Sequence, residues 1–338
     1  MQVLIPAAGK GTRLRPHTYV TPKSLLPVAG KPLLHHIIDR IADLPISRLI
    51  LVVGYLGDAI REDVQKAYSH LPLHFVEQPK QQGLGHSVWV ARSHLHPDEP
   101  LLIILGDTIA DVEWQQFATA DTSLLGVRSV DDPRRFGVVK LRDDGTIEYL
   151  VEKPEHPPSS LAIVGIYYII RPQRLLEALD TLIQQDTRTR GEYQLTDALQ
   201  LMLERGETIR PLPVAEWYDC GNLPMWLATN RTLLDRFAPP PPPVSKDVQI
   251  RPPVWIDPSA TLQNAVVGPY VTIGASSTIA DSTVQNTIVG NNVRIEHSTL
   301  ADSVIGDRSQ VRNVQGSVNI CADSTVTNTV EQNDHSSQ

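Results

Sequence analysis

Apolar and polar positions follow two different patterns along this chain of 338 residues. In residues 1–237, short apolar runs alternate with segments whose apolar residues recur at helical spacing, as Leu33, Ile37 and Ile41 do. This alternation predicts a mostly parallel sheet with helices on both faces. The expected strands are 2–6, 48–53, 73–77 and 100–106, and the expected helices are 32–43, 57–69 and 85–95.

Residues 248–330 have little helical spacing, and their sequence repeats itself. Ile273-Gly274, Val289-Gly290 and Ile305-Gly306 are 16 residues apart, and Ile279, Ile295 and Val311 keep the same step. A fixed step with regularly placed apolar residues is typical of a solenoid in which each coil buries the face of its neighbour. We expect about four to five coils.

Between these two patterns lies a run of five prolines, Pro239 to Pro243. Such a run favours a stiff polyproline II spacer. We therefore predict a domain at 1–237, a linker at 238–247 and a solenoid at 248–330. The polar residues 331–338 are predicted to be disordered.

Composition and charge exclude several classes of protein. The formal net charge is −8 and no basic stretch dominates, which argues against a nucleic-acid partner. The two cysteines lie far apart and support no disulfide framework. No apolar run approaches the length of a membrane span and no signal-peptide pattern opens the chain. We expect a cytoplasmic protein without a membrane partner.

The first strand-like run is followed at once by a loop of small residues. Glycines at 9 and 11 let backbone N–H groups approach phosphate oxygens, and Arg13 and Lys23 add positive charge. This combination suits a nucleoside triphosphate, although Gly-x-Gly alone is equally typical of a tight turn. The spacing matches neither a P-loop nor a dinucleotide-binding fingerprint.

Three later segments carry candidate chemistry, each with a plainer alternative. Asp107 ends a buried apolar run, where a carboxylate can bind Mg²⁺ or cap the next segment. Gln78 has an amide that can pair with a pyrimidine edge, or it belongs to a polar loop before a helix. Glu152-Lys153 can hold a sugar phosphate or form a solvated surface pair. Thr196 or Asp197 is suited to cap a helix of about ten residues.

Longer strings narrow these alternatives. Gly9-x-Gly11-Thr12-Arg13-Leu14, Pro22-Lys23-x-Leu25 and Pro27-Val28-x-Gly30-Lys31-Pro32 together resemble the signature of sugar-1-phosphate nucleotidyltransferases. The repeats resemble the left-handed parallel β-helix of hexapeptide-repeat proteins, so the resemblance covers nearly the whole chain. It implies an α/β fold: a Rossmann-like nucleotidyltransferase domain of the GT-A type, with a mixed sheet, followed by a left-handed β-helix.

The resemblance also implies roles for residues at matching positions. The nucleotide-binding residues would be Ala8, Gly9, Gly11, Thr12, Gln78 and Gly83. The sugar-binding residues would be Gly137, Glu152, Val164, Gly165, Tyr167 and Glu192, although Tyr167 suits the core equally. The catalytic residues would be Arg13, Lys23 and Lys153, and the metal ligands Asp107 and Asp219. Cys220 stands at a position where the resembled family more usually has Thr or Ile. Because neighbouring side chains on a strand point to opposite sides, the Cys220 side chain should point away from the implied metal site at Asp219.

The implied reaction joins a nucleoside triphosphate to a sugar 1-phosphate with Mg²⁺ and releases pyrophosphate. The resemblance is closest to the glucose-1-phosphate thymidylyltransferases and UTP-glucose-1-phosphate uridylyltransferases. A mannose-1-phosphate guanylyltransferase, or an inactive subunit that senses nucleotide sugars, is an alternative. Acyl transfer is a further alternative, with His297 as the only histidine in the coils. The β-helix implies a homo-oligomer.

Overall fold

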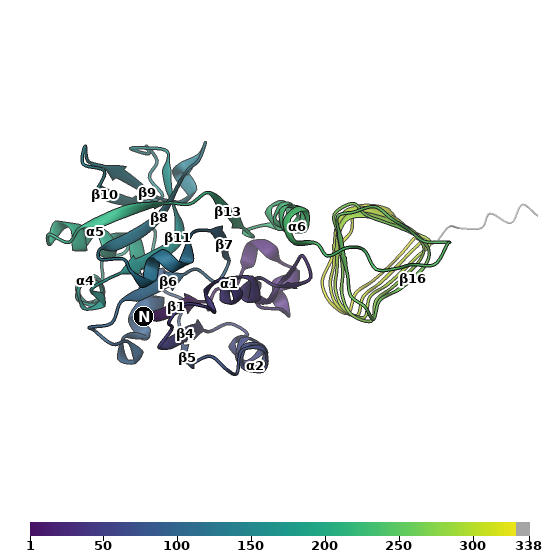
Figure 1. The fold of residues 1–338 in the computed structure, drawn as a ribbon, viewed down its shortest axis with the longest axis horizontal. Helices are drawn as coiled ribbons and strands as arrows, with labels where there is room; N and C mark the ends of the chain where they lie inside the picture. The colour runs from purple at the N-terminus through teal and green to yellow at the C-terminus, as the bar shows by residue number, and fades with distance from the viewer. Residues whose placement is uncertain (329–338) are drawn as a thin grey trace, which may run out of the picture. The chain divides into compact units, whose positions relative to one another are not determined.

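The computed structural model describes residues 1–328, and it divides into two compact units (Figure 1). The predicted disordered tail at 331–338 lies outside the described residues, as do the last two residues of the predicted solenoid. The first unit contains residues 1–10, 22–25 and 33–219, and the second contains 11–21, 26–32 and 220–338. The chain therefore passes between the units several times near its N-terminus. This division differs from the predicted boundary at the proline run.

The first unit is built on a nine-stranded mixed sheet. Its central path runs β10-β9-β11-β6-β1-β4-β5, and β8 and β12 extend it beside β11. The strands are β1 (Gln2–Pro6), β4 (Arg48–Val53), β5 (Leu73–Glu77), β6 (Leu101–Ile104), β8 (Ser123–Ser129), β9 (Gly137–Leu141), β10 (Ile147–Glu152), β11 (Leu161–Ile169) and β12 (Ile209–Pro213). The helices are α1 (Leu33–Ile41), α2 (Gly57–Ala67), α3 (Leu84–Val90), α4 (Pro172–Gln184) and α5 (Leu195–Glu204).

Strand direction changes along this sheet. Strands β6, β1, β4 and β5 are parallel neighbours, as the alternating pattern predicted. Strand β11 is antiparallel to β6, β8 and β9, and β9 and β10 form an antiparallel hairpin. The expectation of a mostly parallel sheet is therefore wrong beyond β6, whereas the mixed sheet is confirmed. The short connection between β9 and β10 permits only antiparallel pairing of these two strands, because a parallel return needs a crossover segment.

The core of the first unit shows why its helices form where they do. Side chains of β1, β4 and β6 such as Leu4, Ile50 and Ile103 are buried in one cluster with Val88 of α3 and Leu199 of α5. The predicted helices 32–43 and 57–69 appear as α1 and α2, and each is two or three residues shorter than predicted. The predicted helix 85–95 ends at Val90, and a 3-10 turn at Arg92–His94 follows.

The second unit contains the predicted solenoid and helix α6 (Leu223–Phe237). Its eleven strands pair in parallel, coil on coil, as a parallel β-helix with triangular coils (Figure 1). They are β14 (Gln249–Ile250), β15 (Val254–Ile256), β16 (Thr261–Val267), β17 (Val271–Ile273), β18 (Thr278–Val289), β19 (Arg294–Glu296), β20 (Thr299–Ile305), β21 (Gln310–Arg312), β22 (Gln315–Gly316), β23 (Asn319–Ile320) and β24 (Thr325–Thr327).

The predicted step of 16 residues appears directly in the strand register. Ile279 pairs with Ile295, and Ile295 pairs with Val311. All three side chains are at most 1 % exposed, so each coil buries the apolar position of the next. His297 has φ of 48°, and its side chain is 59 % exposed, so the only histidine of the predicted coils faces solvent.

Two N-terminal segments also belong to the second unit. They contain 3-10 helices at Thr12–Leu14 and His17–Tyr19 and the short strands β2 (Pro27–Val28) and β3 (Lys31–Pro32). Trp226 of α6 donates from Nε1 to the carbonyl of Pro27 at 2.8 Å. Such contacts with α6 explain why these segments group with the C-terminal part of the chain. Within the described residues, no helix combines the length and the apolar composition that a membrane span requires.

Candidate active site

The carboxyl ends of the parallel strands place three short loops of the first unit together. Ala8 follows β1, Gly54 follows β4 and Gln78 follows β5. A Cβ atom on Gly54 would lie 3.0 Å from the Cβ of Ala8 and 3.0 Å from the Gln78 carbonyl oxygen. Ligands of α/β sheets bind at this edge of the sheet. Among the predicted nucleotide-binding residues, the structure therefore brings Ala8 and Gln78 together.

Gln78 is 4 % exposed, and its amide already has partners. Its Nε2 group donates to the carbonyl of Gly83 at 3.2 Å and lies 3.0 Å from Nδ1 of His86. Both amide hydrogens are thus directed into the protein, and Oε1 is the atom that remains for a base. His86 is 8 % exposed and stacks on Trp89 and Tyr193. Burial lowers the pKa of His86, so the neutral imidazole holds the Gln78 amide.

Gly83 has φ of +106°, a conformation that favours glycine. A Cβ atom there would lie 2.6 Å from the Tyr193 carbonyl oxygen and 2.8 Å from the Cβ of Glu192. Close packing of two chain segments therefore requires this glycine. Glu192 lies beside Gly83 and accepts from Gln194 Nε2 at 3.2 Å. The predicted sugar residue Glu192 and the predicted nucleotide residue Gly83 are direct neighbours.

The predicted metal ligands lie side by side. Asp107 follows β6, and Asp219 ends β13 (Glu216–Asp219), which pairs antiparallel with β7 (Thr108–Asp111). In this register Asp219 is opposite Thr108, the residue after Asp107. Nζ of Lys23 donates to Oδ2 of Asp107 and lies 3.9 Å from Oδ1 of Asp219. We call Lys23, Asp107 and Asp219 the acidic corner.

The acidic corner has the donor chemistry of a hard cation site. Among its three members, carboxylates outnumber the lysine two to one. Within residues 1–328, no cluster of three or more His, Cys, Asp or Glu side chains is present that forms a complete protein cage. Two carboxylates fit an ion such as Mg²⁺, which keeps several waters and is completed by substrate phosphates.

A second group of predicted residues forms around Glu152 at the end of β10. Its carboxylate accepts from Thr196 Oγ1 at 2.7 Å and pairs with Lys153 Nζ at 3.0 Å. Gly137 is opposite Glu152 in the β9–β10 hairpin, and a Cβ atom there would lie 3.1 Å from Oε2 of Glu152. We call Gly137, Glu152, Lys153 and Thr196 the sugar corner, after the predicted role of its first three residues.

Thr196 or Asp197 was predicted to cap helix α5, and that prediction is wrong for both residues. Helix α5 begins at Leu195 with Gln194 as its N-cap, so Thr196 lies in the first turn. Its hydroxyl is therefore available to Glu152. Asp197 lies in the same turn, and burial together with the nearby Glu152 charge raises the pKa of its carboxyl.

Backbone geometry at the sugar corner is unusual. Lys153 has φ of 44°, which is uncommon for a residue with a long side chain. Its N–H donates to the Phe136 carbonyl at 2.9 Å, and its own carbonyl accepts from Arg190 at 2.8 Å. Residues held in such conformations cluster at functional sites. Arg190 did not emerge as a site residue from the sequence.

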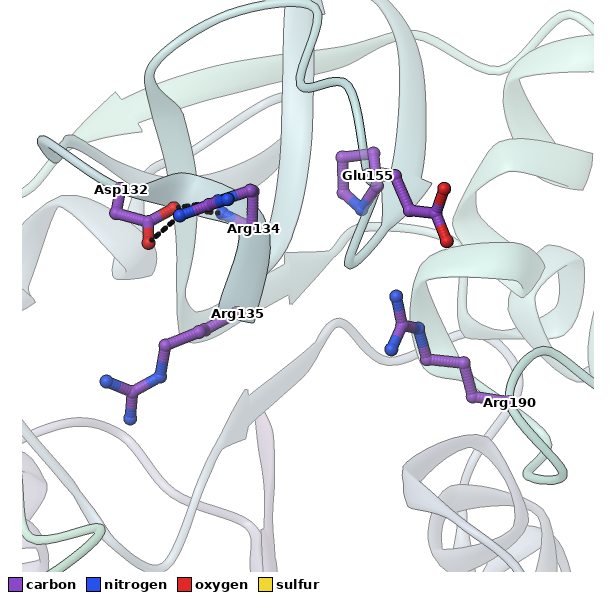
Figure 2. A pocket seen from close by; sticks show the side chains of 6 residues that line it. Asp132, Arg134, Arg135, Glu155 and Arg190 are labelled. Carbon is purple, nitrogen blue, oxygen red and sulfur yellow. Dashed lines mark hydrogen bonds and ion pairs between the residues drawn. The ribbon is translucent and has the colours of Figure 1, made fainter.

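Arg190 also lines an open cavity of about 350 Å³ with Asp132, Arg134, Arg135, Pro154 and Glu155 (Figure 2). Arg134 is paired with Asp132 at 2.8 Å, whereas Arg135 points away from that pair in Figure 2. Pro154 and Glu155 directly follow Lys153. The cavity brings three guanidinium groups and two carboxylates next to the segment that carries Lys153, so its lining has a small excess of positive charge.

The other predicted sugar residues lie on β11. The register of β11 against β8 shifts between Ile163 and Tyr167, which places Val164 and Gly165 in a bulge. Bulges are over-represented next to active sites. Gly165 has φ of +84° and lies against Leu105 and Thr108, beside Asp107. The side chains of Val164 and Tyr167 are buried, and Tyr167 belongs to the core cluster. Burial raises the pKa of the Tyr167 hydroxyl.

The remaining predicted residues are Gly9, Gly11, Thr12 and Arg13. A Cβ atom on Gly9 would meet nothing within 4 Å, so this backbone is open to a ligand. Gly11 has φ of 60°, and Thr12 and Arg13 begin the first 3-10 helix of the second unit. Gln81 was missed by the sequence reasoning. Its Nε2 group donates to the Ala8 carbonyl at 2.5 Å and ties the first loop to the Gln78 loop.

Comparisons with known proteins identify the family of this chain. A family model described as "Nucleotidyl transferase" matches residues 2–236. The chain is 36 % identical over 225 residues to the UTP–glucose-1-phosphate uridylyltransferase AglF of Haloferax volcanii, covering 64 % of this chain and 89 % of the relative. It is 33 % identical over 332 residues to a glucose-1-phosphate thymidylyltransferase of Streptomyces antibioticus, covering 94 % of this chain and 91 % of the relative.

A solved structure is similar to part of the chain as well. It is a putative glucose-1-phosphate thymidylyltransferase from Bacillus anthracis in complex with a sucrose. The TM-score is 0.59 with 26 % sequence identity, covering 69 % of this chain and 94 % of the solved chain. The relatives in sequence and in structure therefore share one kind of catalytic domain.

Proposed function

Since the chain belongs to the nucleotidyl transferase family, we propose that it transfers a nucleotidyl group from dTTP or UTP to glucose 1-phosphate. The products would be a nucleotide sugar and pyrophosphate. The observation that carries the proposal is the acidic corner, where Lys23 lies between two carboxylates at the edge of the sheet that binds ligands. The names of the relatives in Haloferax and Streptomyces support glucose 1-phosphate and a pyrimidine nucleotide.

The chemistry needs little from the protein beyond position and charge. An oxygen of the sugar phosphate is already ionised near neutral pH, so it can attack the α-phosphorus without a general base. One P–O bond forms to this oxygen, and the bond to the β-phosphate oxygen breaks in line with it. Pyrophosphate leaves with the electron pair. Catalysis then comes from orientation and from neutralising charge.

The residues of the chain divide these tasks. Lys23 would lie near the α-phosphate, and Arg13 would hold the β- and γ-phosphates. Lys153 would bind the sugar phosphate, while Glu152 accepts hydrogen bonds from the sugar hydroxyls. Members of this family generally use a divalent metal ion, and Asp107 and Asp219 would hold Mg²⁺. Bound there, the ion would supply positive charge against the phosphates.

A substrate matrix tests the proposal. Pyrophosphate release is measured with Mg²⁺ while dTTP, UTP, GTP, ATP and CTP are crossed with glucose, mannose, galactose and N-acetylglucosamine 1-phosphates. Preference for dTTP or UTP with glucose 1-phosphate is the expected result. A preference for GTP and mannose 1-phosphate would keep the mechanism and overturn the substrates. Binding of nucleotide sugars without pyrophosphate release from any pair would overturn the catalytic proposal and favour a sensing subunit.

The β-helix is proposed to support a homo-oligomer, as the resemblance implied. Its polar coil surfaces are compatible with self-association, and sedimentation velocity of the full chain measures the mass of the assembly. A monomer at micromolar concentration would contradict this part of the proposal.

A further inference from the structure

His17 in the second unit is a buried histidine that the proposed reaction does not use. It is 5 % exposed and begins the 3-10 helix His17–Tyr19, four residues after Arg13. Nε2 of His17 donates to Oδ1 of Asn319 at 2.5 Å. Asn319 begins β23 in a late coil of the β-helix, 302 residues further along the chain. A loop at the start of the chain is thus hydrogen-bonded to its other end.

The surroundings of His17 make this contact specific. Its ring lies edge-on against Trp226 of α6, with ring centroids 5.2 Å apart. The neighbouring Thr18 donates from Oγ1 to the Gly11 carbonyl at 2.9 Å. The His17 turn therefore holds the backbone of Gly11, two residues before Arg13. His17 is buried whereas Asn319 is exposed, so the hydrogen bond lies at the edge of the unit and gives the ring nitrogen of His17 a protein partner.

The segment after Lys23 is anchored in the same way. The Ala29 N–H donates to Oδ1 of Asn230 at 2.8 Å, and Thr272 of the β-helix donates to the same oxygen at 2.8 Å. Gly30 has φ of +93°, and Trp255 of the β-helix fills the space where a Cβ would be. In sequence, Lys23 lies between two segments that are both held by α6 and the β-helix.

We infer that Asn319, acting through His17, is a positioning residue for the nucleoside triphosphate. The hydrogen bond between them fixes the turn that holds Gly11, and this turn sets the direction of the Gly11–Arg13 backbone. The β-helix thereby contributes to the binding of the nucleotide, in addition to any role in assembly. The inference rests on the proposed function for the identity of the ligand, while the anchoring of the loop does not.

Three variants of Asn319 and its surroundings test this inference. Asn319→Ala removes the acceptor, and Asn319→Asp keeps an oxygen for His17. Gln315→Ala is the matched control, because Gln315 is an exposed amide on β22, which pairs with the same strand β20 as β23 does. Each variant is compared with the wild-type full chain for KM of both substrates, for turnover and for Tm.

We expect Asn319→Ala to raise KM for the nucleoside triphosphate roughly 3- to 10-fold, the factor that one ordinary hydrogen bond corresponds to. Turnover and KM for the sugar 1-phosphate should stay within about twofold of the wild type. Asn319→Asp should restore KM, and Gln315→Ala should not change it. An equal rise of KM for both substrates together with a lower Tm would overturn the inference, since it would indicate a structural role alone.

Hydrogen–deuterium exchange of the peptide that covers residues 11–21 separates this inference from the proposed function. Asn319→Ala should accelerate exchange in this peptide and leave the peptides of β9 and β10 unchanged. If the wild type releases no pyrophosphate but exchange still accelerates, the proposed function fails and the anchoring stands. If exchange and KM are both unchanged in Asn319→Ala, the inference is wrong.

Discussion

The acidic corner and the sugar corner each place a lysine beside a carboxylate, but they differ in charge and in support. In the acidic corner one lysine lies between two aspartates, so carboxylates outnumber the lysine among its three members. In the sugar corner Lys153 balances Glu152, and the arginines of the adjoining cavity add positive charge. The first arrangement suits a cation and the second suits a phosphate, so we predict opposite ligands for the same pair of residue types.

Support differs as well. The acidic corner joins the ends of separate strands, and its lysine comes from a short segment of the first unit. The carboxylate of the sugar corner is 8 % exposed, and Thr196 holds it in addition to Lys153. The carboxylate of the sugar corner is thus held before any ligand binds, whereas in the proposed function Lys23 would exchange carboxylate contacts for phosphate contacts. This comparison can be tested by removing one group from each corner.

The largest effect is expected from Asp107→Asn. Losing one electrostatic contact to the transition state typically costs about 3–4 kcal/mol, so turnover should fall roughly a hundredfold or more at saturating Mg²⁺. Tm should stay near that of the wild type, because the amide keeps the size of the side chain. Steady-state pyrophosphate release measures the effect. Asp121→Asn, at an exposed carboxylate of the same unit, is the control. Near-normal turnover in Asp107→Asn would remove this residue from the metal site.

Lys153→Ala should have the next largest effect. It removes the charge that we assign to the sugar phosphate and leaves Glu152 without its ion pair. We expect KM for the sugar 1-phosphate to rise roughly 10- to 100-fold, with KM for the nucleoside triphosphate little changed. Lys140→Ala is a matched control, since Lys140 pairs with Glu148 at 2.9 Å on the same hairpin and is exposed. A comparable effect of both variants would contradict the assignment.

Thr196→Val should have a smaller effect on the same corner. The change keeps the shape of the side chain and removes the hydroxyl that donates to Glu152. A roughly three- to tenfold rise in KM for the sugar 1-phosphate is expected from the loss of one hydrogen bond to a charged group. Thr196→Ser should preserve activity because it keeps the donor. If valine and serine behave alike, Thr196 does not orient Glu152.

The smallest effect is expected for the pH dependence of the melting temperature, which we attribute to His17 in the second unit. Burial lowers the pKa of His17, with the Asn319 hydrogen bond opposing this shift. The unfolded chain then binds a proton more readily than the folded chain, so stability falls as the pH drops below the ordinary value of about 6.5. Thermal melts at pH 7.5 and 5.5 should differ by about 2 °C more in the wild type than in His17→Gln. An identical pH dependence in both proteins would show that His17 does not titrate on unfolding.

Local patterns were enough to predict much of the fold. The apolar runs predicted β1, β4 and β5, and the 16-residue step predicted the coils. Both signals could be recognised because each lies within a short stretch of the sequence. The predicted metal ligands lie together, since the register of β13 on β7 brings Asp219 beside Asp107. The roles of the predicted residues in binding remain predictions.

Other features could not be read from local patterns. Thr196 resembled a helix cap because its hydrogen-bond partner, Glu152, is distant in sequence and no nearby residue indicates this contact. Gln81 gave no signal because its partner is a backbone carbonyl in another loop. The membership of residues 11–21 in the second unit depends on α6 and the β-helix, which lie hundreds of residues away. Tertiary contacts of this range have no periodicity in the sequence.

The long separation of His17 and Asn319 has a consequence for synthesis on the ribosome. The 302 residues between them take about 15–60 s to translate at typical bacterial and eukaryotic rates. During that interval the first unit has its central strands, but the turn after Arg13 lacks its final partner. The turn after Arg13 should therefore reach its final structure late, only after the coil that carries Asn319 has formed.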